Sequence, residues 1–212
     1  LDNGNYLLGV YIADVSNYVK EGTFLDLEAF ERGTSVYLPD RVIPMLPKKL
    51  SNGICSLNEG VDRLVMGCEI EVNEFGDIVN SEIFEGIINS KHRMTYDDVN
   101  KILNGDEALI NKYSDIYDML ITANKLSKIL NKKRIERGAF MFETPEAKII
   151  LNDNGNVVDI VLRQRFDAEC LIEEFMLLAN ECVAQTMTWL DVPFIYRVHE
   201  EPLDDKVNKL ML

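Results

Sequence analysis

An acid and an amide stand seven residues apart in a segment that is otherwise almost entirely apolar. Glu173 and Asn180 belong to the stretch LIEEFMLLAN, residues 171–180. In an α-helix seven residues make about two turns, so the two side chains share one face. A buried polar group without a partner is costly. The pair therefore indicates either a binding face, or an exposed Glu and an Asn that bonds a neighbouring loop.

Two aromatic residues stand beside turns. Tyr37 precedes Pro39 in SVYLPDRV, where a Tyr ring can project from the backbone with its hydroxyl in water. Phe142 ends the short apolar segment GAFMF before a polar loop, and Phe140 lies on the same face of that segment. Taken alone, an aromatic beside a loop is more often a packing residue than part of a binding site.

Several common catalytic patterns are absent from the sequence. His92 and His199 stand in unrelated contexts, and neither G-x-S-x-G nor a Gly-rich phosphate loop occurs. The four cysteines form no C-x-x-C pair, which favours reduced core thiols over a zinc site. Asp14 is expected to make a turn with the backbone near Ser16 or Asn17, since a single carboxylate does not make a magnesium site.

Composition predicts a soluble cytoplasmic protein with one sizeable core. The chain has 212 residues, is 47% hydrophobic and carries a net charge of −14. No apolar run reaches the roughly 18 residues of a membrane span. The acidic balance argues against a phosphate-binding surface unless the basic residues are clustered. Four such clusters occur, each equally consistent with a solvated face: Arg41, Lys48, Lys49; Lys91, His92, Arg93; Lys132, Lys133, Arg134, Arg137; and Arg163, Arg165.

Hydrophobic periodicity predicts an α+β fold, in which a mixed or antiparallel sheet with hairpins packs against several helices. The expected elements are a strand at 6–13, a helix at 24–32 after Thr23, a hairpin from 64 to 88, a helix at 95–103, a long helix at 107–134, a hairpin at 148–163 and a last helix at 167–190. The core stripe of the last helix is expected to consist of Ala168, Leu171, Ile172, Phe175, Ala179, Cys182, Val183, Thr186 and Leu190.

Three consecutive segments resemble one family. IADVSNYV (12–19), LDLEAFERGTSVYLPDRVIPMLP (25–47) and LSNGICSLN (50–58) are similar to landmarks of the ribonuclease II / ribonuclease R (RNB) family, most of all to ribonuclease R. The resemblance implies a magnesium-dependent exoribonuclease that hydrolyses RNA processively from its 3′ end to nucleotide monophosphates. It implies single-stranded RNA as the partner, with no membrane or DNA partner, and a monomer.

The resemblance also assigns roles to the residues above. Tyr37 and Phe142 match aromatics that stack on bases near the 3′ end, while Glu173 and Asn180 match a channel helix that meets ribose hydroxyls. The chain would be the central part of one RNB-type catalytic domain, residues 1–212, truncated at both ends. The metal-binding aspartates are expected before Leu1, so no catalytic residue and no metal are expected in this piece, which would be inactive alone. The alternative is a non-catalytic RNA-binding or interaction module that keeps the family fold.

Overall fold

The structure is a computed structural model that describes residues 1–139, 146–162 and 164–198, together with residues 200, 203, 206, 207 and 209. Its helices and strands follow the order β1 (Tyr6–Ala13), α1 (Phe24–Arg32), β2 (Val36–Tyr37), β3 (Val42–Ile43), β4 (Asp62–Val72), β5 (Ile78–Asn89), α2 (Tyr96–Leu103), α3 (Glu107–Lys112), α4 (Tyr117–Glu136), β6 (Ala147–Leu151), β7 (Val157–Leu162) and α5 (Asp167–Trp189). A 3₁₀ turn, η1 (Val15–Asn17), and a π-helical turn, η2 (Lys49–Ile54), lie in the connections.

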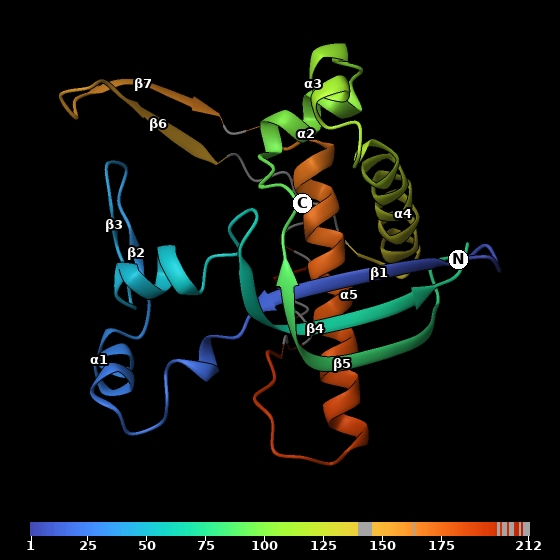
Figure 1. Cartoon of the computed structure of the whole chain (residues 1–212), viewed down its shortest axis with the longest axis horizontal. Helices are drawn as coiled ribbons and strands as arrows, with labels where there is room; N and C mark the ends of the chain where they lie inside the picture. Colours follow the sequence, from blue (N-terminus) through green and yellow to red (C-terminus); the bar gives the residue numbers. More distant parts are fainter. Residues whose placement is uncertain are drawn as a thin grey trace.

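The central layer is an antiparallel sheet in the order β1-β4-β5, which α5 crosses on one face with α4 alongside it (Figure 1). Val10 lies opposite Cys68, and Cys68 opposite Ile83. The main core fills the space between the sheet and these two helices. Its buried residues are Leu8, Cys68, Ile70, Val72, Leu126, Leu130, Leu178, Ala179 and Cys182. The α+β fold expected from the sequence is confirmed.

A second, smaller core joins α2, α3 and α4 to the start of α5. Its buried residues are Val99, Ile102, Leu120 and Ala168. The predicted helix from 107 to 134 is broken within this core, because α3 ends at Lys112 and α4 begins only at Tyr117. At the break, Asp115 Oδ2 lies 2.8 Å from His92 Nε2 and the ring of Tyr113 packs edge-on against His92. The break thus coincides with contacts to a residue far back in the sequence, and it divides the expected helix into a short α3 and a 20-residue α4.

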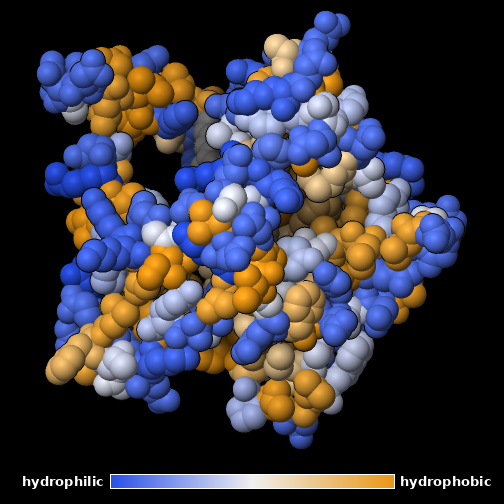
Figure 2. Space-filling model, viewed as in Figure 1, coloured by the Kyte–Doolittle hydropathy of each residue, from blue (hydrophilic) through white to orange (hydrophobic). Residues whose placement is uncertain are grey.

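Two small antiparallel ribbons, β2–β3 and β6–β7, lie outside the main sheet (Figure 1). In Figure 2 the lobe formed by β6 and β7 stands away from the body and carries apolar side chains. Ile149, Val158, Ile160 and Leu162 share one face of this hairpin and are exposed. Helix α1 has its predicted bounds, yet Phe24 and Phe30 are 93% and 85% exposed, so these two apolar side chains face solvent.

Helix α5 has the expected bounds to within one residue, but its buried face differs from the predicted stripe. Glu174 and Leu178 are buried, whereas Ile172 and Leu190 are exposed. The reason is that α4 as well as the sheet packs on α5, which extends the covered face. None of the helices within the described ranges is long and apolar enough to cross a membrane.

Candidate nucleic-acid interface

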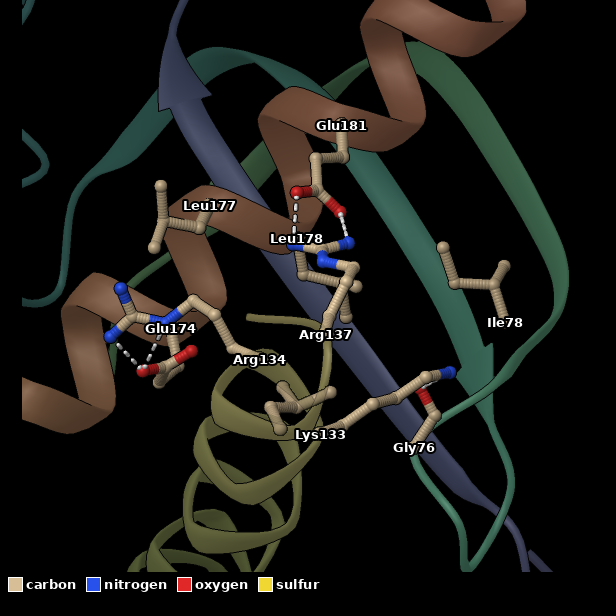
Figure 3. Close-up of a pocket in the computed structure, with 10 residues that line it drawn as sticks. Gly76, Ile78, Lys133, Arg134, Arg137, Glu174, Leu177, Leu178 and Glu181 are labelled. Carbon is tan, nitrogen blue, oxygen red and sulfur yellow. Dashed lines mark hydrogen bonds and ion pairs between the residues drawn. The ribbon is translucent and has the colours of Figure 1, made fainter. Parts of the chain in front are cut away.

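Two adjacent acids in the first half of α5 have different surroundings. Glu174 is only 3% exposed. Its Oε1 accepts hydrogen bonds from Arg134 Nε at 3.1 Å, Arg134 Nη2 at 2.7 Å and Asn131 Nδ2 at 2.7 Å. A buried carboxylate needs this kind of compensation, because its desolvation costs several kcal/mol or more. Glu174 is therefore an anchor between α5 and α4, and Figure 3 shows its contact with Arg134.

Glu173, by contrast, is partly in solvent, with its side chain 39% exposed. Its Oε1 lies 3.3 Å from Arg134 Nη2, and its Oε2 lies 2.6 Å from Arg165 Nη2. Arg165 precedes α5 in the chain, and its side chain is 42% exposed. Both carboxylate oxygens of Glu173 thus face a guanidinium, so the acid is accessible without being unpartnered.

Asn180 lies on the same helix, about 10 Å further along the axis at 1.5 Å per residue, and it is exposed. The seven-residue spacing predicts that the two side chains share one face of α5, and in the structure both reach solvent. Whether they touch a ligand stays a prediction.

Tyr37 projects from the β2–β3 ribbon with 78% of its surface exposed. The ribbon turns through Pro39 and Asp40, where Leu38 N donates to Arg41 O at 2.8 Å, and Tyr37 pairs with Val42. A ring held out in this way can stack on a planar group without unfolding anything. The ribbon and the middle of α5 belong to separate parts of the fold (Figure 1). Phe142 lies outside the described residues.

A pocket lies where α4, α5 and the β4–β5 turn meet (Figure 3). Lys133 reaches the turn, where its Nζ donates to Gly76 O at 2.9 Å and pairs with Asp77. Arg137 forms a two-point ion pair with Glu181 on α5, at 2.8 and 3.3 Å. Hydrogen bonds from Lys133 and Asn73 lower the pKa of Asp77, and Glu181 raises the pKa of Arg137. Lys133, Arg134 and Arg137 each pair with a carboxylate. The pocket is therefore a contact region between α4, α5 and the β4–β5 turn.

Asp14 makes the turn expected of it, since its Oδ1 accepts hydrogen bonds from Asn17 N at 3.1 Å and Ser16 Oγ at 2.6 Å. Among the residues that the structure describes, no group of three or more His, Cys, Asp or Glu side chains gathers in a way that could hold a metal ion. The described part of the chain therefore offers no fit for magnesium.

Sequence reasoning missed the two arginines that hold the acids. Arg134 was assigned only to a basic cluster, and Arg165 to another. The available signal was the Glu-Glu pair itself, because two acids inside an apolar helix require nearby cations if one is buried.

Comparisons with known proteins agree on one family. The RNB domain family matches residues 1–212. Ribonuclease R from Thermotoga maritima is 54% identical over 211 residues, which are 99% of this chain and 30% of that protein. Two structures of Mycoplasma genitalium RNase R superpose with a TM-score of 0.87 at 36% identity. The first is a complex with ribose methylated single-stranded RNA, and its superposition covers 96% of this chain and 32% of that chain. The second is a complex with double-stranded RNA, and its superposition covers 97% of this chain and 36% of that chain. The chain thus spans about a third of the length of these relatives.

Proposed function

We propose, since this chain belongs to the RNB domain family, that it is the RNA-holding part of an enzyme that removes nucleotides one at a time from the 3′ end of RNA. The observation that carries the proposal is the match over the whole chain to a family whose similar members are named Ribonuclease R. The proposal includes processive release of nucleotide monophosphates by a monomeric cytoplasmic protein.

Three described residues have assigned roles in this proposal. The exposed ring of Tyr37 stacks on a base near the 3′ end, which is a sequence-tolerant way to hold a single strand. Glu173 and Asn180 meet ribose hydroxyls on the exposed face of α5. A 2′-hydroxyl both donates and accepts a hydrogen bond, so an acid and an amide suit it and favour RNA over DNA. Phe142 would supply a second stacking ring.

In the proposed enzyme, hydrolysis would depend on bound magnesium, for which the described residues offer no cluster of three or more ligands. Bound magnesium ions would supply an activated water and stabilise the attacking and leaving oxygens. Because the described residues do not fit a metal, no step of the reaction is assigned to them. The 212-residue chain alone is accordingly expected to release no mononucleotides.

The test uses the full-length protein that contains this chain, with a single-stranded RNA labelled at its 5′ end and an all-deoxy oligonucleotide of the same sequence. Shortening of the RNA in single-nucleotide steps with magnesium, blocked by EDTA, is the expected result. The DNA should stay intact. Tight RNA binding without shortening under any divalent metal would instead identify a non-catalytic RNA-binding module.

The roles of Glu173 and Asn180 are tested separately. Glu173→Ala or Asn180→Ala should slow RNA cleavage more than it lowers the melting temperature, because both side chains lie on the solvent side of α5. Normal turnover by variants that melt earlier would make these residues structural.

A further inference from the structure

The two ion pairs that meet at Glu173 and Glu174 differ in how readily they can open. The pair of Arg134 with Glu174 is buried, with side chains 19% and 3% exposed. The pair of Arg165 with Glu173 lies at the surface, at 42% and 39%. Breaking a buried pair is strongly destabilising, because it leaves an uncompensated charge in the interior, whereas an exposed pair contributes little to stability. Of the two arginines, Arg165 is therefore the one that can leave its carboxylate more readily.

Arg134 would remain a partner of Glu173 if Arg165 moved away from it. The group contains two guanidiniums, Arg134 and Arg165, and two carboxylates, Glu173 and Glu174. If Arg165 turned away, Glu173 would keep Arg134 Nη2 at 3.3 Å from its Oε1 and would also be open to water. The freed Oε2 of Glu173 would then be available to a hydroxyl donor.

We propose that Arg165 is a phosphate-binding residue that Glu173 holds in place until RNA arrives. A backbone phosphate takes the guanidinium, whose planar fork fits phosphate as well as carboxylate. The Oε2 atom of Glu173 that Arg165 leaves then accepts a hydrogen bond from a ribose hydroxyl. One surface ion pair is thus replaced by two contacts to the substrate. The inference rests on the proposed function, because it names the part of the RNA that this end of α5 would meet.

The exchange has a consequence that a purely structural ion pair lacks. An all-deoxy strand has no 2′-hydroxyl to donate a hydrogen bond to Glu173, so Glu173 gains no contact when Arg165 leaves it. The carboxylate of Glu173 then only competes with the phosphate for Arg165. Glu173→Ala removes this competitor and should tighten binding of the deoxy strand. Arg165→Ala removes the phosphate contact and should weaken ribose and deoxy strands alike.

The experiment measures binding of the full-length protein to the ribose and deoxy oligonucleotides in EDTA at several salt concentrations. Each phosphate contact to a single strand contributes about 0.7 to the slope of log K against log salt. Arg165→Ala should reduce the slope by about that amount, and Arg165→Lys, which keeps the charge, should restore it. Arg137→Ala is the matched control, because it breaks another surface arginine–glutamate pair on α5 and should leave the slope unchanged.

An unchanged slope for Arg165→Ala would overturn the inference, as would weaker binding of the deoxy strand by Glu173→Ala. Should Arg165→Ala fail to fold, Arg165→Gln carries the same expectation, and Glu173→Ala tests the competition independently. Absence of RNA binding by the unmodified protein is a different outcome, because it would refute the proposed function itself.

Discussion

Asn100 on α2 caps the first turn of α5 from outside the helix. Its Oδ1 accepts a hydrogen bond from Ala168 N at 2.9 Å, and its Nδ2 donates to Glu169 Oε2 at 3.1 Å. The residue that precedes the helix is Phe166, whose apolar side chain has no oxygen to accept a bond from the free amide groups of the first turn. The amide of Asn100 replaces the missing cap and ties α2 to α5.

Replacing this cap should destabilise the fold. Asn100 is 8% exposed, so Asn100→Ala leaves Ala168 N without its partner in a buried place and should cost about 1–2 kcal/mol of unfolding free energy. Asn100→Asp should cost no less, since an ionised carboxylate cannot donate to Glu169. Urea unfolding of the chain followed by far-UV circular dichroism measures both, with the exposed Asn111→Ala on α3 as the control. Equal midpoints for Asn100→Ala and Asn111→Ala would contradict the capping role.

The buried pair of Arg134 and Glu174 predicts an asymmetry between its two halves. Arg134→Met leaves Glu174 buried with Asn131 as its one remaining donor among the described residues, and should cost about 3–5 kcal/mol. Glu174→Gln should cost less, because Arg134 keeps Glu173 at 3.3 Å. The double variant should recover part of the loss, since it removes the unpaired charge.

The comparison requires urea midpoints for the two single variants and the double variant. Additive losses would mean that the two side chains do not interact in solution.

The sequence predicts a structural feature well when the residues that produce it are neighbours in the chain, and poorly when they are far apart. The bounds of α1 follow from neighbours alone, because Thr23 Oγ1 accepts from Asp26 N and Gly33 takes a φ of +65° that suits glycine. The hairpin of β4 and β5 follows from period-two alternation and a turn. At the break between α3 and α4 Asp115 meets His92, and no local pattern contains that contact.

The candidate site divides in the same way. The exposure of Tyr37 could be predicted, since it follows from the turn at Pro39. Which of two adjacent glutamates would be buried could not, because α4 brings Arg134 to α5 from about 40 residues away. The seven-residue spacing identifies a face of the helix, and only the packing of α4 decides whether that face is inside or outside.

The low pKa of Asp77 predicts an acid-sensitive link between the β4–β5 turn and α4. Hydrogen bonds from Lys133 and then Asn73 hold the pKa of this carboxyl below its ordinary value. A group whose pKa is depressed by folding stabilises the fold above its unfolded pKa, which is about 3.9 for Asp. That contribution is lost as the pH falls from there through the lower folded pKa.

Asp77→Asn should therefore flatten the acid limb of stability against pH, below about pH 5, and change the slope near neutrality little. Urea midpoints between pH 7 and pH 2.5 give the profile. Asp153→Asn, in the turn of the β6–β7 hairpin, is the matched control and should run parallel to the unmodified chain. A parallel profile for Asp77→Asn as well would rule out the link to Lys133 as a source of acid sensitivity.

Tyr37 gives the sharpest prediction for function, because the residue is 78% exposed and is not part of either core. In the full-length protein, Tyr37→Ala should leave the melting temperature unchanged and remove one stacking platform, worth about 1–3 kcal/mol. A processive enzyme releases its substrate when the remaining strand no longer holds its contacts. The variant should therefore stop earlier and leave longer end products.

Tyr37→Phe keeps the π face and lacks only the hydroxyl, so its end products should match those of the unmodified protein. A 5′-labelled oligonucleotide resolved on a denaturing gel shows the length of the limit product for each variant. Val42→Ala, at the position that pairs with Tyr37 in the ribbon, controls for a disturbed β2–β3 turn. If Tyr37→Ala and the unmodified protein left products of one length, the ring would not be a stacking platform. If Val42→Ala lengthened the products as much as Tyr37→Ala, the shape of the ribbon rather than the ring would set the end point.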